Sequence, residues 1–67
     1  MKKLFDTDYV LLDKANDTLV SFTNGNVIIY GNKDEAEIDC YGNESVTRCT
    51  DLPQHHQENL TNQLNKT

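Results

Sequence analysis

Two cysteines and two histidines are the residues of this chain best suited to bind a metal ion. They are Cys40, Cys49, His55 and His56. Thiolate sulfur and imidazole nitrogen are common ligands of tetrahedral zinc, and a bound ion would stabilise so short a chain. The spacing argues against a zinc site, because such sites use close pairs such as C-x2-C, and adjacent histidines on a helix point about 100° apart. We therefore expect no metal and no cofactor.

The two thiols have two other interpretations. Buried cysteines behave as small apolar groups, and this is the interpretation that the sequence favours. A disulfide between Cys40 and Cys49 is the alternative, since it would close a short loop and contribute about 2–3 kcal/mol. The two histidines are then expected on a helix, largely solvated, with His56 partly packed.

The chain contains residue types that act in catalysis, but they do not form a recognisable catalytic motif. Ser21, Ser45, both histidines and many carboxylates occur, but no nucleophile elbow, phosphate loop, H-E-x-x-H or C-x-x-C is found. A domain this small rarely encloses the ~300 Å³ that a ligand pocket needs. We therefore expect a protein that is not an enzyme, with no catalytic residue.

Four carboxylates crowd into six consecutive residues. They are Asp34, Glu35, Glu37 and Asp39. Such a run is most often the solvated face of a helix, where acids favour the N-terminus. The functional alternatives are an acidic face for a basic protein and a mimic of nucleic-acid charge. The run lacks the D-x-D-x-D-G order of a calcium loop.

The totals limit the partners and the compartment. Sixty-seven residues make one small domain, with residues 1–7 as a lead-in and 65–67 expected to fray, and the formal net charge of -5 disfavours direct binding to nucleic acid. The start Met-Lys-Lys-Leu-Phe-Asp resembles a signal peptide only until Asp6 interrupts it, and no run approaches the ~18 apolar residues of a membrane span. We expect a soluble, cytoplasmic protein that does not bind membranes.

The elements that position these residues are organised around a β-hairpin over Thr18 to Gly31. Asn24-Gly25 is the dipeptide that most favours a two-residue type I′ turn. That turn places Thr23 opposite Asn26, and the alternation of side chains then assigns every residue to a face. One face carries Val20, Phe22, Val27 and Ile29, and the other carries Leu19, Ser21, Ile28 and Tyr30.

The second face is more apolar than a solvated face should be. We expect the Phe22 face to build the core and Leu19, Ile28 and Tyr30 to contact another protein. The N-terminal Leu4 and Phe5, or a second copy of the chain, are alternative covers for it.

The other elements follow in order. The run Tyr-Val-Leu-Leu within Asp8 to Asp13 has strand composition and is expected to pair with the Leu19 strand in a meander. Asn32 with Glu35 fits a capping box and favours a helix from Lys33 to Tyr41 with Gly42 after it, although alternating apolar residues also fit a strand there.

The last third of the chain is predicted as a strand followed by a helix. The segment 44–50 is a short fourth strand. Pro53 suits the first turn of a polar C-terminal helix with the stripe His56, Leu60 and Leu64. Leu52, just before the proline, is positioned to cover the start of that helix.

Several of these segments together resemble small accessory proteins encoded by tailed bacteriophages. They are Tyr-Val-Leu-Leu-Asp-Lys at 9–14, Phe-Thr-Asn-Gly-Asn-Val-Ile-Ile-Tyr at 22–30, Asp-Glu-Ala at 34–36 and Leu-Pro at 52–53. No catalytic motif comes with this resemblance. It implies that the chain binds and blocks, or redirects, a host protein such as a defence protein, in the host cytoplasm.

The expected fold is α+β, with a three- to four-stranded antiparallel meander and both helices packed on the Phe22 face. The expected function is a non-enzymatic protein-binding module, an inhibitor or modulator of a host protein. A structural module that forms homodimers or larger oligomers, and an acidic nucleic-acid mimic, are the alternatives.

Overall fold

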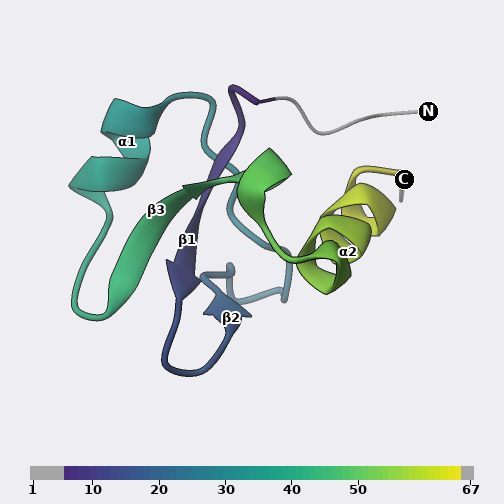
Figure 1. Cartoon of the computed structure of the whole chain (residues 1–67), viewed down its shortest axis with the longest axis horizontal. Helices are drawn as coiled ribbons and strands as arrows, with labels where there is room; N and C mark the ends of the chain where they lie inside the picture. The colour runs from purple at the N-terminus through teal and green to yellow at the C-terminus, as the bar shows by residue number, and fades with distance from the viewer. Residues whose placement is uncertain (1–5, 66–67) are drawn as a thin grey trace.

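The computed structural model describes residues 6–65, which form three short strands, two α-helices and one 3-10 helix. In chain order these are β1 (Tyr9–Asp13), β2 (Thr18–Leu19), α1 (Lys33–Ile38), β3 (Glu44–Arg48), the 3-10 helix (Cys49–Asp51) and α2 (Gln54–Asn65). The small α+β class and the C-terminal helix are confirmed. Figure 1 shows α1 and α2 on opposite sides of the sheet.

The strand β1 is the centre of the sheet. The strand order is β2-β1-β3, and both pairs are antiparallel. β3 pairs with β1 along its whole length, from Tyr9 opposite Arg48 to Asp13 opposite Glu44. The predicted four-stranded meander is not confirmed, because β1 lies in the middle of three strands. The strand predicted over 44–50 does form, as β3.

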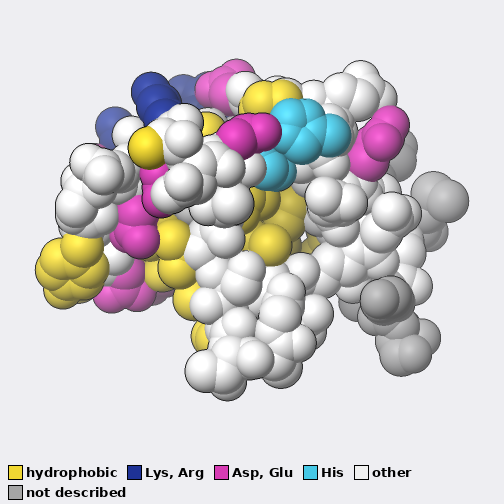
Figure 2. Space-filling model, turned by 90° about the horizontal axis from the view of Figure 1, so that it is seen from below, with side chains coloured by type: hydrophobic (Ala, Val, Ile, Leu, Met, Phe, Trp, Pro, Cys, Tyr) yellow, Lys and Arg dark blue, Asp and Glu magenta, His cyan; other side chains and the backbone are white. Residues whose placement is uncertain are grey.

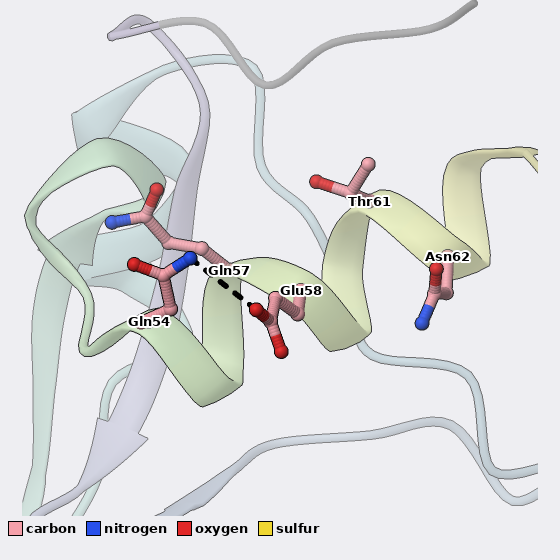
Figure 3. A pocket seen from close by; sticks show the side chains of 5 residues that line it. All are labelled: Gln54, Gln57, Glu58, Thr61 and Asn62. Carbon is pink, nitrogen blue, oxygen red and sulfur yellow. Dashed lines mark hydrogen bonds between the residues drawn. The ribbon is translucent and has the colours of Figure 1, made fainter.

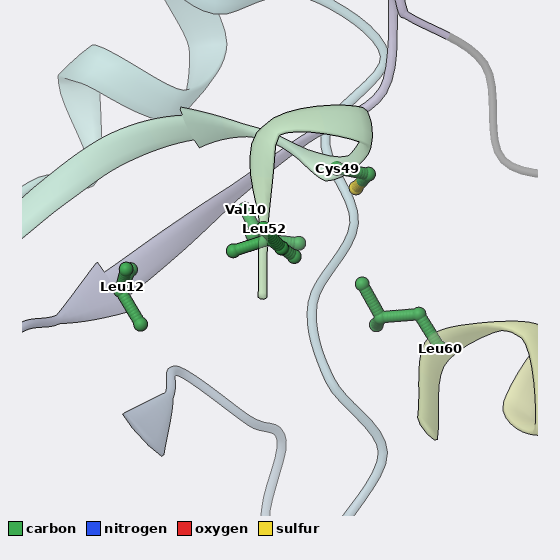
Figure 4. Close-up of a cluster of buried hydrophobic side chains, with 5 residues drawn as sticks. All are labelled: Val10, Leu12, Cys49, Leu52 and Leu60. Carbon is green, nitrogen blue, oxygen red and sulfur yellow. The ribbon is translucent and has the colours of Figure 1, made fainter. Parts of the chain in front are cut away.

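Both faces of β1 are buried, and this divides the core into two clusters. Val10 and Leu12 project to one face and Leu11 to the other, because side chains alternate along a strand. The α2 cluster consists of Val10, Leu12, Cys49, Leu52 and Leu60, with Leu19, Val27 and Ile29 packed against it (Figure 4). The α1 cluster consists of Leu11, Tyr30 and Ala36, with Tyr9, Val20, Ile28, Cys40 and Val46 packed against it. The helices therefore cover opposite faces, and their predicted packing on one face is wrong.

The hairpin forms, but its loop is one residue longer than predicted. Ser21 pairs with Val27, and Gly25 donates its N–H to the carbonyl of Phe22. Asn24 does not have the positive φ that a type I′ turn needs, whereas Gly25 has a φ of 93°. These features describe a three-residue loop, a type I turn followed by a glycine in a left-handed conformation.

The longer loop changes the face assignment of the hairpin. Leu19, Val27 and Ile29 now lie against the α2 cluster, and Val20, Ile28 and Tyr30 lie against the α1 cluster. Phe22, predicted to be a core residue, is 56% exposed. The predicted faces are therefore wrong, as expected when pairing shifts by one residue.

The helix predicted from Lys33 forms but is shorter. Asn32 is the N-cap, and its side-chain oxygen accepts a hydrogen bond of 2.8 Å from the N–H of Glu35. The helix ends at Ile38 with Asp39 as C-cap, so Gly42 lies in the next turn rather than directly after the helix. Ala36 anchors α1 in the core.

The C-terminal helix follows Pro53 as predicted. His56 and Leu60 are buried and Leu64 is half-buried, so the predicted stripe faces the core. Gln63 fastens α2 to the hairpin, because its amide accepts from the N–H of Val27 at 2.8 Å and donates to the carbonyl of Val27 at 3.0 Å.

Two expectations concern the membrane and the N-terminus. Within residues 6–65, no helix has the length and apolar character to cross a membrane. The predicted docking of Leu4 and Phe5 on the core lies outside the described residues.

Candidate functional site

The most chemically distinctive cluster consists of Asp17, His55 and His56. The Nε2 atom of His55 lies 2.9 Å from Oδ2 of Asp17, and the Nε2 atom of His56 lies 2.9 Å from Oδ1. The imidazole rings are 4.1 Å apart between centroids and tilted by 41°. Figure 2 shows the two histidines side by side on one face, with an acidic side chain next to them.

Two local structures bring these side chains together. The histidines lie in the first turn of α2, which begins with Gln54 after Pro53, and Asp17 ends the turn between β1 and β2 with a φ of 53°. A left-handed conformation has a modest cost for aspartate, and it aims the carboxylate at the start of α2. The two histidines were predicted to point apart. This is wrong for their Nε2 atoms, which both lie against the carboxylate of Asp17.

The cluster is open on one side and buried on the other. The side chains of His55 and Asp17 are 58% and 59% exposed, whereas that of His56 is 9% exposed. A shallow hollow of about 220 Å³ lies beside them, lined by Asp17, Thr18, Leu19, Ser21, Val27, His56 and Asn59. Small solutes therefore have access to the carboxylate and to the inner ring.

Hydrogen bonds from the rings stabilise the charged form of Asp17. The bond to His56, and then the bond to His55, hold the pKa of the Asp17 carboxyl below its ordinary value. An ionised carboxylate with two imidazoles is a ligand set for a divalent metal. The sequence signal for this cluster is a pair of adjacent histidines in the first turn of a helix that follows a proline, together with an aspartate in the short turn between β1 and β2.

The cysteines do not belong to this cluster. Both are free thiols, so no disulfide joins them. Within residues 6–65, neither cysteine lies in the group of possible metal ligands that contains the histidines. Cys49 is fully buried, and burial raises the pKa of its thiol to about 12. Cys40 is half-buried, and its Sγ donates to the carbonyl of Glu44 at 3.1 Å.

A second candidate site lies at the end of α1, where apolar side chains project among acids. Ile38 is 72% exposed and Tyr41 is 73% exposed. The predicted acidic residues are exposed around them and comprise Asp34, Glu35, Glu37 and Asp39. Figure 2 shows hydrophobic and acidic side chains together at the left end of the molecule, where α1 and β3 meet in Figure 1. We call this the α1 surface.

The α1 surface is held in place by the core. The hydroxyl of the buried Tyr30 donates to Oδ2 of Asp39 at 2.9 Å. Tyr41 and Glu44 close a turn on each other, since the Glu44 carboxylate accepts from the N–H of Tyr41 and the N–H of Glu44 donates to the carbonyl of Tyr41. Burial and the bond to Asp39 raise the pKa of Tyr30, so its hydroxyl remains a donor.

The three predicted anchor residues do not share an open face. Tyr30 is 8% exposed, and Leu19 and Ile28 are half-buried against different clusters. The longer hairpin loop explains this, because it places Leu19 on the α2 side and Ile28 on the α1 side. The most exposed large apolar side chains are instead Ile38 and Tyr41, outside the hairpin, followed by Phe22 within it.

The outer face of α2 is polar. Gln54, Gln57, Glu58, Thr61 and Asn62 line an open hollow there (Figure 3). Gln54 donates to Glu58 at 3.3 Å, and Gln57 donates to the carbonyl of Leu52 at 2.7 Å. These bonds stabilise the first turns of α2 and tie them to the preceding segment. We therefore assign this face a structural role.

Comparisons with protein-family models, with curated proteins and with solved structures found no match.

Proposed function

We propose that the chain is a non-enzymatic protein-binding module whose contact surface is the α1 surface, and that its partner presents basic residues around an apolar socket. Exposed apolar anchors ringed by charge are the usual composition of a binding hot spot and its rim. The observation that carries the proposal is the exposure of Ile38 and Tyr41 on a segment fastened to the core.

Preorganisation supports this use of the surface. A partner does not have to order α1, because Asn32 caps it and Ala36 anchors it. The turn that carries Tyr41 is closed by Glu44. Binding therefore forfeits little conformational entropy, and the anchors retain most of their binding energy.

Charge selects the class of partner. The chain has a formal net charge of -5, and four exposed acids lie on the same segment as the two anchors. A basic protein surface is attracted at long range, and its association slows as salt screens the charges. The resemblance to phage accessory proteins makes a host protein the natural partner, which would be inhibited or redirected.

Matched variants test the proposal in an affinity capture from bacterial host lysate. The wild type is compared with the double variant I38S/Y41S and with F22S, which removes an exposed aromatic from the hairpin loop instead. We expect one protein to be retained by the wild type and F22S and lost by I38S/Y41S. A catch that is the same for all three variants would refute the proposal.

The two alternative functions predict different results for these variants and one further variant. If the chain acts by self-association, I38S/Y41S lowers the mass measured by sedimentation without changing the capture. If it is a nucleic-acid mimic, E35Q/E37Q abolishes the capture while I38S/Y41S does not. Either result would replace the proposal.

A further inference from the structure

The Asp17, His55 and His56 cluster has the donor set of a transition-metal site that the proposed function does not use. The three donor atoms come from two segments that lie almost forty residues apart in sequence, and they all fall within 4.8 Å of one another. We propose that this cluster binds a divalent zinc-type ion through one oxygen of Asp17 and the Nε2 atoms of His55 and His56.

The present distances are close to those that such an ion requires. Zinc binds imidazole nitrogen and carboxylate oxygen at about 2.0–2.2 Å, so tetrahedral donors lie about 3.4 Å apart. Each Nε2 lies 2.9 Å from an Asp17 oxygen. His55 and His56 contact different oxygens of Asp17, so the exposed Asp17 and His55 side chains rotate to bring one oxygen and both Nε2 atoms to that separation around the ion.

The three positions differ in rigidity in a way that suits a binding site. His56 is 9% exposed and packs beside the core, so one donor is fixed. His55 and Asp17 are exposed and adjust around it. Placing the lone pairs on the ion requires each ring to carry any remaining proton on Nδ1.

The site also has an entry path and an open coordination position. The hollow beside Asp17 and His56 is lined partly by Thr18, Ser21 and Asn59. Three protein donors leave the fourth tetrahedral position to water or to a small anion, which the open hollow admits.

Metal binding fastens two elements together. Asp17 precedes β2, and the histidines begin α2, so an ion bound by all three links the edge of the sheet to the C-terminal helix. Any ligand that binds only the folded state raises its stability. We therefore expect zinc to raise the melting temperature as its concentration rises.

Zinc titration by calorimetry, with cobalt absorption as a second readout, tests the site on the full chain. The key variant is H55Q, because His55 is exposed and its replacement leaves the core intact; D17N is the second variant, since asparagine also accepts the left-handed conformation. We expect one ion per chain, weakened by about tenfold or more in each variant. We expect cobalt to give the visible bands of a tetrahedral site with nitrogen and oxygen donors.

Two controls separate this site from the others on the molecule. E35Q/E37Q should bind zinc like the wild type, because the α1 surface lies on the other side of the sheet. C40S should also bind zinc with wild-type affinity and show the same cobalt absorption bands as the wild type. Wild-type affinity in H55Q and D17N, or a thiolate-to-cobalt charge-transfer band, would overturn the proposal.

Discussion

For some single residues the sequence predicted the burial or the contacts correctly, and for others it did not. The exposed acids and the buried Leu60 occupy positions that the pattern predicted. Asp17 was not recognised, because its role depends on a left-handed turn that brings it to histidines 38 and 39 positions later. No local pattern reports a contact over that sequence separation.

The two thiols should differ sharply in reactivity. Cys49 is fully buried with a pKa of about 12, whereas Cys40 is half-buried near the surface. Since the thiolate is the reactive form, we expect an alkylating reagent to modify Cys40 first and Cys49 only when the chain unfolds. Peptide mass spectrometry after timed labelling measures this. Equal rates in native buffer would contradict the assigned burial, and equal rates in denaturant serve as the control.

Asp13 gives a prediction for acid stability. Its carboxylate accepts from the Asn16 side chain at 3.0 Å and from the N–H of Ala15, and chiefly the Asn16 bond lowers its pKa below 3.8. A depressed pKa contributes stability above the unfolded value, and that contribution disappears as the pH falls through the folded value. We expect the stability difference between wild type and D13N to shrink as the pH falls from neutral through the lowered pKa of folded Asp13.

Denaturant unfolding of both proteins at several pH values measures that difference, and the other carboxyls cancel because both chains contain them. A difference that is constant or grows as the pH falls would contradict the role of Asp13.

At the scale of elements, helix starts were predicted well and strand order was not. Asn32 and Pro53 act locally, so their positions fix the starts of α1 and α2. Strand order depends on which faces are covered. The run Tyr-Val-Leu-Leu of β1 is apolar on both faces, which is typical of a central strand covered on both sides.

The hairpin register could not be deduced from Asn-Gly alone. That dipeptide also fits a loop in which only the glycine has positive φ, and Gly25 adopts this form. The core distinguishes the two registers, because the observed one groups Leu19 with Val27 and Ile29 against the α2 cluster, and Val20 with Ile28 and Tyr30 against the α1 cluster. The predicted interface residues moved into the core for this reason.

Gln63 should prove important for attaching α2 to the hairpin. Its amide pairs with both backbone groups of Val27. In Q63A these partly buried groups lose their partner, and we expect a loss of about 1–3 kcal/mol in the free energy of unfolding. N62A is the matched control on the same helix and should stay within about 0.5 kcal/mol of wild type, since Asn62 is exposed. Equal losses in the two variants would show that the Gln63 bonds do not matter.

At the scale of the whole molecule, the sheet separates two sites. The α1 surface offers apolar anchors among acids, and the Asp17, His55 and His56 cluster lies at the start of α2. Different clusters of the core support the two helices. A partner and a metal ion could therefore bind independently, and H55Q should not alter protein binding.

The affinity of the captured partner for wild type, Y41S and F22S tests the central claim most directly. We expect Y41S to weaken binding by about thirtyfold, the loss of one hot-spot residue, and F22S to bind like the wild type, with both affinities falling as salt rises. Unchanged affinity in Y41S together with weakened binding in F22S would contradict the claim that Tyr41 and the α1 surface form the contact.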